Sequence, residues 1–185
     1  LGEGRPGGPA PDIHLHFLMM TMEDVPHPDI WKQFFKGAPP GSYSAWVHCK
    51  YPDKCKADLA QSGLSDIFQI VPAVYNAWCV DLVSPELQLY RSALAQKTVP
   101  EGIPEKFILM SGDTLPIKPF TVIREELGKH PFASDFCIYP TTWWSYVEGD
   151  MTTLAPSASQ WNVLAREDAE TLVSKMPQPS PDHPV

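Results

Sequence analysis

The sequence lacks the features that mark nucleic-acid-binding proteins, membrane spans and the commonest nucleotide-binding and hydrolase sites. It has 14 lysines and arginines against 22 acidic residues, and its net charge of −8 leaves no basic surface for nucleic acid. No apolar run approaches the ~20 residues that a membrane-spanning helix needs. No strand-like run is followed by a glycine-rich phosphate-binding loop, and no G-x-S-x-G nucleophile elbow occurs. Nucleic acid is therefore not an expected partner, and membrane association is expected only through an anchor outside this chain.

Cysteine is scarce, and no C-x-x-C pair occurs among Cys49, Cys55, Cys79 and Cys137. An even number of cysteines permits disulfides without requiring them. The spacing of Cys49 and Cys55 fits no common zinc pattern. Cys79 and Cys137 have apolar neighbours, so we expect them to be buried free thiols.

The length and composition fit one α/β domain with a sizeable core. Residues 1–12 are rich in glycine and proline and are expected to be disordered, and the proline-rich residues 177–185 form an expected unstructured tail. Residues 13–176 form the expected domain. The chain begins with Leu1 rather than methionine and has no signal peptide, which suggests a fragment or a processed chain.

Apolar periodicity predicts alternating strands and helices over residues 13–176. Expected strands cover residues 13–22, 43–49, 68–71, 107–110, 136–139 and 159–166. Expected helices cover residues 30–36, 85–97, 120–129 and 167–175, with Asp29 and Ser84 as N-caps of the first two. This alternation predicts a mixed α/β sheet of mainly parallel strands.

The stretch around residues 107–114 organises the rest of the prediction. The apolar run from Phe107 to Met110 has the length of a strand buried on both faces. It ends at Ser111, Gly112 and Asp113, which are small or polar. Ligands bind at the carboxyl ends of strands in open α/β sheets, so this loop is the leading candidate site; an ordinary turn is the alternative.

Two further patterns each admit a functional and a structural interpretation. His14 and His16 lie on one face of the first expected strand, where they form either part of a metal site or a polar strand face. Trp144 and Trp161 belong to aromatic segments that form either a sugar-binding platform or a hydrophobic cover. Of the two, Trp144 is expected to face a ligand and Trp161 to lie in the core. No pair of carboxylates has the spacing of a good metal clamp.

Several segments, in chain order, resemble one known enzyme family. They are His16–Thr21, Ile30–Gly37, Tyr43–His48, Phe107–Pro116 and Ser159–Arg166. In the same order, they are similar to the opening strand and to the "LW..FF.G", "YS.YVH", "F.LLS...IP" and "SQW..L.R" segments of the core-2/I-branching β-1,6-N-acetylglucosaminyltransferases. The wider relatives of that family include the protein xylosyltransferases.

The resemblance implies a GT-A-like, Rossmann-type sheet that binds a UDP-sugar at its strand ends. It implies transfer of a sugar of the GlcNAc or xylose class to a glycan or protein hydroxyl, with inversion and with a carboxylate as general base. It also implies that the enzyme works without a metal cofactor, and that it lies in the lumen of the Golgi or secretory pathway. Implied nucleotide-binding residues are Thr21, Met22, Glu23 and Asp24. Implied substrate-binding residues are Ser111, Gly112, Asp113, Trp144, Ser159, Gln160 and Trp161.

The chain also departs from the family pattern. Thr114 stands where the family usually has cysteine, Trp78-Cys79 where it has Trp-Gly, and Ser157 where it has a basic residue. The family's base glutamate and its diphosphate-binding arginine and lysine lie beyond the residues matched, so no catalytic residue is assigned and the isolated chain is expected to be inactive. Two alternatives remain: a non-catalytic carbohydrate- or protein-binding module of the same fold, and an unrelated α/β enzyme acting on phosphorylated metabolites.

Overall fold

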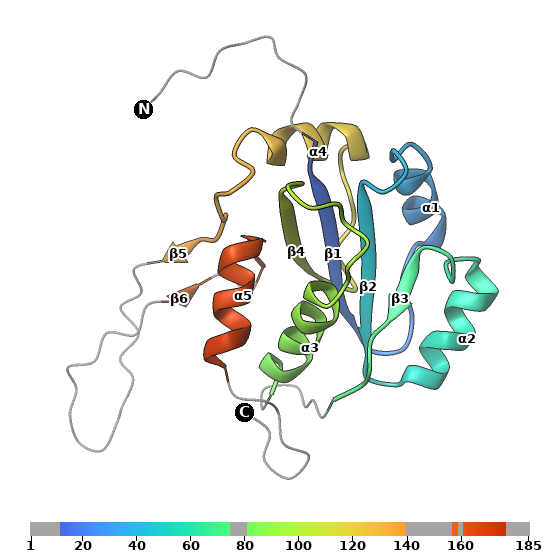
Figure 1. The fold of residues 1–185 in the computed structure, drawn as a ribbon. Helices are drawn as coiled ribbons and strands as arrows, with labels where there is room; N and C mark the ends of the chain where they lie inside the picture. Colours follow the sequence, from blue (N-terminus) through green and yellow to red (C-terminus); the bar gives the residue numbers. More distant parts are fainter. Residues whose placement is uncertain (1–11, 75–80, 140–156, 159–160, 177–185) are drawn as a thin grey trace, which may run out of the picture.

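A computed structural model describes residues 12–74, 81–139, 157–158 and 161–176, and its main sheet confirms the predicted mixed α/β fold (Figure 1). The strands are β1 His14–Thr21, β2 Tyr43–Cys49, β3 Phe68–Ile70, β4 Glu105–Ser111, β5 Ile138–Tyr139, β6 Ser157–Ala158 and β7 Val163–Ala165. The helices are α1 Pro28–Lys36, α2 Pro52–Ser62, α3 Val83–Leu94, α4 Phe120–Gly128 and α5 Arg166–Lys175. The main sheet has the order β3-β2-β1-β4-β7, and β5 and β6 form a separate antiparallel pair.

The first four strands of the chain are parallel, and β7 alone runs antiparallel in the main sheet. The chain builds outward from β1 through β2 to β3, then crosses by way of α3 to β4 on the opposite side of β1. The strand order therefore reverses between β1 and β4. In open α/β sheets, a crevice forms at the carboxyl ends of the strands that flank such a switch point.

One face of the sheet is covered by an aromatic layer. Phe17 of β1 packs against Phe34 and Phe35 of α1 and against Phe120 of α4, with ring centroids 5.2 to 6.2 Å apart. This confirms that the aromatic stripe of the first helix is a core face. Tilted and edge-on rings at these separations add to the stability that apolar burial provides.

The other face packs against α3 and α5, which lie in front of the sheet in Figure 1. Phe107 and Leu109 of β4 point to this face and pack in one cluster with Leu89 of α3 and Ala169 of α5. Their neighbours Ile108 and Met110 point to the aromatic layer. The run from Phe107 to Met110 is thus covered on both faces, as its apolar character predicted.

Helix α2 was not predicted from the sequence. Pro52 occupies its first turn and Gly63 ends it in the left-handed region with φ of 70°, so both terminal signals are present. Only Cys55 and Leu59 of this helix are buried, which leaves a periodic apolar stripe too sparse to recognise.

The two predicted N-caps are wrong. Helix α1 begins at Pro28, before Asp29, and His27 precedes it with φ of 56°. Ser84 lies inside α3, where its backbone N–H donates a hydrogen bond to the carboxylate of Asp81 at 2.9 Å. In both cases the helix begins earlier than the prediction, because a proline or an acidic side chain supports the first turn.

One cysteine differs from the prediction, and two others form a disulfide, which the sequence had left open. Cys49 and Cys55 form a disulfide that joins the end of β2 to the first turns of α2, with Cα atoms 6.2 Å apart. Cys137 is an exposed free thiol rather than a buried one. It precedes β5, which pairs with β6 outside the main sheet, and Phe136 beside it is half exposed. Cys79 lies outside the described residues.

Candidate functional site

A cavity of about 350 Å³ lies at the carboxyl ends of the parallel strands, where the strand order reverses. Its walls come from segments that are far apart in the sequence. The segment after β1 contributes Thr21, Met22 and Asp24, and the segment at the end of β4 contributes Ser111, Gly112 and Asp113. The remaining lining residues used below are His48, Leu82, Pro85 and Trp161. We call this cavity the strand-end pocket.

The ends of β1 and β4 touch closely at Gly112. Its backbone N–H donates to the carbonyl oxygen of Met20 at 2.8 Å. A Cβ atom at position 112 would lie only 2.8 Å from Oγ1 of Thr21, and this hydroxyl donates to the carbonyl oxygen of Asp24 at 2.6 Å. Glycine at this position therefore permits the two strand ends to approach each other, and this approach shapes the floor of the pocket.

The loop after β4 is a tight turn. The backbone N–H of Thr114 donates to the carbonyl oxygen of Ser111 at 3.0 Å. The hydroxyl of Thr114 in turn accepts the backbone N–H of Ser111 at 3.2 Å. The turn leaves Asp113 exposed at the pocket, where its carboxylate can accept hydrogen bonds from a ligand hydroxyl.

His48 of β2 also lines the pocket, although it was not predicted as a binding residue. Its Nε2 atom accepts the backbone N–H of Val74 at 3.2 Å, which leaves Nδ1 as the protonated nitrogen of the neutral ring. Burial lowers the pKa of His48 to about 4, so the ring is neutral near pH 7. Its position at the end of a strand beside β1 is the signal that could have identified it.

The start of α3 and Trp161, two residues before β7, form two further walls of the pocket. Leu82 and Pro85 lie at the start of α3, and Trp161 lies just ahead of β7. Trp161 is 42% exposed, so the prediction that it lies in the core is wrong. β7 pairs with β4 only through its three residues, and Trp161 lies beyond that pairing, at the rim of the sheet.

Three predicted site residues are not placed by the structure, and a fourth lies elsewhere. Trp144, Ser159 and Gln160 lie outside the described residues. Glu23 is not among the residues that line the strand-end pocket, and its carboxylate pairs with Lys54 at 2.6 Å. The part of the predicted site that the structure brings together is therefore the residues from the ends of β1 and β4, together with Trp161.

The charge of the strand-end pocket is negative. Asp24 and Asp113 are the formally charged residues among its described lining, and neither lysine nor arginine contributes to that lining. A diphosphate placed there would meet like charges, whereas a neutral ring or a sugar hydroxyl would not. These walls suit the nucleoside or sugar portions of a ligand better than its phosphates.

A second cavity of about 530 Å³ adjoins the first and is mostly apolar. It lies over Ile108, Met110 and Val163 of the sheet, and Ile123 of α4 contributes to its wall. Trp161 lines both cavities.

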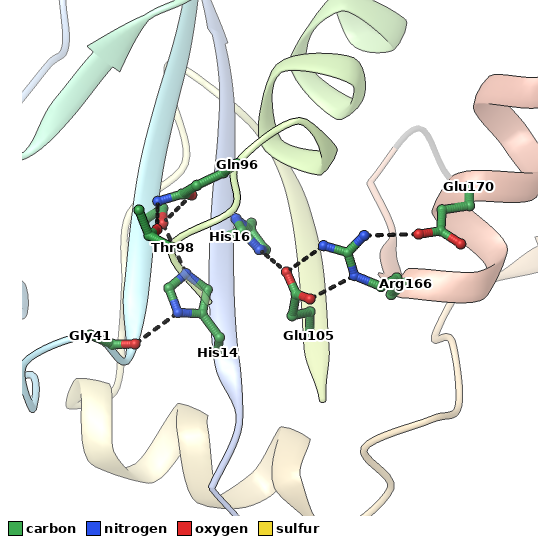
Figure 2. A network of polar contacts seen from close by, with 9 residues as sticks. His14, His16, Gly41, Gln96, Thr98, Glu105, Arg166 and Glu170 are labelled. Carbon is green, nitrogen blue, oxygen red and sulfur yellow. Dashed lines mark hydrogen bonds and ion pairs between the residues drawn. The ribbon is translucent and has the colours of Figure 1, made fainter. Parts of the chain in front are cut away.

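His14 and His16 belong to a polar network near the amino ends of β1 and β4, at the end of the sheet opposite the strand-end pocket (Figure 2). The Nδ1–H of His14 donates to the carbonyl oxygen of Gly41 at 2.8 Å, and its Nε2 atom lies 2.8 Å from the hydroxyl of Ser44. Burial lowers the pKa of His14 to about 4, which favours the neutral ring. Both ring nitrogens of His14 are thus engaged within the protein.

His16 connects this network to α5. Its Nε2–H donates to the carboxylate of Glu105 at 2.8 Å, and Arg166 donates to both oxygens of the same carboxylate at 2.6 and 2.9 Å. Burial by itself would raise the pKa of Glu105, but these hydrogen bonds outweigh it and hold the pKa at about 2. In the described part of the chain, no group of three or more histidine, cysteine, aspartate or glutamate side chains could hold a metal ion. The geometry therefore assigns the histidine pair to a structural network that joins β1, β4 and α5.

Comparison with known proteins identifies no family for this chain. No protein-family model matches it, and no curated protein matches it significantly. Within the described residues, no helix is long and apolar enough to cross a membrane.

Proposed function

We propose that this chain is the donor-binding part of an inverting glycosyltransferase of the core-2/I-branching type, with a GT-A-like fold. The donor is a UDP-sugar of the GlcNAc or xylose class, and the acceptor is a hydroxyl of a glycan or protein. The observation that carries the proposal is the strand-end pocket. Residues chosen from the sequence at the ends of two separate strands line one cavity at the switch point of the sheet.

The polarity of the pocket supports a nucleoside and sugar as its occupants. Its volume of about 350 Å³ is within the range of ligand pockets, and it combines apolar walls with a few polar groups. Trp161 offers a flat apolar surface, and Asp113 offers acceptors for hydroxyl groups. Stacking of a base on an aromatic side chain is worth about 1–3 kcal/mol, so Trp161 would supply part of the binding free energy of a uridine nucleotide.

The negative charge of the pocket bears on how the diphosphate is held. The resemblance implies metal-independent transfer, with basic side chains outside the matched segments neutralising the diphosphate. Under this proposal the pocket itself binds the uridine and sugar portions, and transfer needs a base glutamate that lies beyond the matched segments. The proposal also places the chain in the lumen of the secretory pathway, and the Cys49–Cys55 disulfide supports an oxidising compartment.

Calorimetry with uridine, UDP, UDP-GlcNAc and UDP-xylose tests the proposal, with GDP as the control for the base. The titrations are run in EDTA and repeated with Mn²⁺. We expect binding of uridine nucleotides, no binding of GDP at the same concentrations, and the same affinities with and without the metal. A strong requirement for Mn²⁺ would contradict the metal-independent part of the proposal.

A matched pair of variants locates the binding. Ser111→Tyr places a large side chain in the strand-end pocket, and Ser65→Tyr places the same side chain on an exposed turn outside it. We expect Ser111→Tyr to weaken uridine binding by about tenfold or more, because the side chain would fill much of the cavity, while Ser65→Tyr leaves it unchanged. Equal affinities for the two variants would refute the assignment of the pocket. Binding of free glycans without any uridine nucleotide would favour the non-catalytic module instead.

A further inference from the structure

Asn162 connects two of the walls of the strand-end pocket, the one at Trp161 and the one at the start of α3. It follows Trp161, which forms one wall, and its backbone carbonyl oxygen accepts the N–H of Leu109 in β4 at 3.0 Å. This bond fixes the main chain beside Trp161 to β4. The residue is half-buried, so its side chain needs partners within the protein.

The side chain of Asn162 finds those partners on α3. Its Oδ1 atom accepts the hydroxyl of Tyr90 at 2.5 Å, and its side chain lies near the carboxyl group of Glu86, whose pKa it lowers. Tyr90 is fully buried, and Glu86 follows Pro85, which lines the pocket. The amide oxygen thus accepts a hydrogen bond from α3, and asparagine or glutamine is the residue type that offers such an amide.

These contacts connect two segments that line one cavity. The first turn of α3 supplies Leu82 and Pro85 to one wall, and Trp161 supplies another. Glu86 and Tyr90 are one helical turn apart, so they present their polar groups on the same side of α3. A shift of α3 relative to the sheet would break the bonds to Asn162, and a shift of Trp161 would strain them.

We propose that Asn162 is a positioning residue, which holds Trp161 in a fixed orientation against the start of α3 so that a planar ring of the ligand can stack on the indole. An indole that only covered the end of the sheet would not need a neighbour with a polar connection to α3. The stacking part of this inference rests on the proposed function, because it takes the ligand to be a uridine nucleotide. The clamp itself concerns only the described residues and is tested separately.

The variants are Asn162→Ala, which removes the whole connection, and Tyr90→Phe, which removes one hydroxyl. Tyr43→Phe is the matched control, because it removes a hydroxyl from an aromatic residue of the opposite core. Each variant is also made with Trp161→Phe, so that the fluorescence of Trp161 is obtained by difference. Thermal unfolding of each variant shows whether it remains folded.

The first measurement is quenching of Trp161 fluorescence by acrylamide without any ligand. We expect Asn162→Ala to raise the quenching constant of the Trp161 component about twofold, Tyr90→Phe to raise it less, and Tyr43→Phe to leave it unchanged. The second measurement is the affinity for UDP. Loss of the connection is expected to weaken binding about fivefold, the effect of one lost hydrogen bond.

The outcomes separate this inference from the proposed function. If the wild-type chain binds no uridine nucleotide, the proposed function fails and the quenching measurement still decides whether Asn162 holds Trp161. If folded Asn162→Ala shows wild-type quenching of Trp161 and wild-type affinity for UDP, the positioning role is refuted. Rescue of both properties by Asn162→Gln, which keeps an amide, would support it, because a purely steric role would not need the amide.

Discussion

Replacing Gly112 with alanine tests the contact that joins the ends of β1 and β4. The added Cβ atom would lie 2.8 Å from Oγ1 and 3.2 Å from Cβ of Thr21, both closer than van der Waals contact allows. Thr21 cannot turn away without losing the hydrogen bond that it donates to Asp24. Either the two strand ends separate or this hydrogen bond breaks.

The magnitude follows from three contributions. Overpacking of this kind costs about 1–3 kcal/mol. Loss of the Thr21 hydrogen bond adds about 1 kcal/mol if the side chain rotates instead. Replacing glycine with alanine also restricts the unfolded chain, which offsets the cost by about 0.4–1 kcal/mol. We expect Gly112→Ala to lower the free energy of unfolding by roughly 0.5–2.5 kcal/mol.

The assay is urea unfolding monitored by tryptophan fluorescence and circular dichroism, with the free energy taken from linear extrapolation. Gly37→Ala is the matched control, because an added Cβ there meets nothing within 4 Å and the φ angle of −94° suits any residue. The control is expected to stay within about 0.5 kcal/mol of the wild type or to be slightly more stable. In a Thr21→Gly background, Gly112→Ala should cost less than it does alone. Equal free energies for the two single variants would refute the packing argument.

Three other predictions follow from the buried polar groups and the disulfide. Burial lowers the pKa of His14 and His48 to about 4 and raises the pKa of Glu86 to about 7, so lowering the pH from 7.5 to 5.5 weakens the fold through the histidines and strengthens it through Glu86. In a Glu86→Gln background, which removes the opposing group, the unfolding free energy is expected to fall by roughly 2–3 kcal/mol over this range, and a flat profile would contradict neutral buried rings. Glu105→Gln removes a carboxylate held by a histidine and an arginine, and we expect it to lower the free energy of unfolding in urea by about 2–4 kcal/mol. A change below about 0.5 kcal/mol would show that the network is dispensable. Replacing Cys49 and Cys55 together with serine opens a short loop, for which chain entropy predicts a loss of about 2 kcal/mol; an unchanged urea midpoint would argue that the disulfide contributes no stability.

The fold was predictable where a local pattern decides the outcome. The run from Phe107 to Met110 is too short for a helix and too apolar for a surface strand, so a buried strand was the remaining choice. Helix α2 escaped because only two of its side chains are buried, and apolar periodicity is the main local signal for a helix. The capping errors at Asp29 and Ser84 have a similar origin, because several residues near each helix start are acceptable caps in isolation.

The candidate site was predictable only in part. Residues at the ends of β1 and β4 were chosen because parallel strands present their carboxyl ends to one edge. His48, Leu82 and Pro85 were missed because they join the pocket through the packing of β2 and α3 against β1. Trp161 was expected in the core because a large aromatic side chain is usually well buried, but its place beyond the paired part of β7 leaves it exposed.

The sequence by itself determined the alternation of strands and helices, because side-chain periodicity and the residues at the ends of elements are local properties. It also determined which polar residues follow the buried strands. Only the tertiary structure decided that the strand order reverses between β1 and β4, that Gly112 must lack a side chain to pass Thr21, and that Asn162 connects the sheet to α3. These features depend on contacts between segments that lie far apart in the chain, and no local pattern records such contacts.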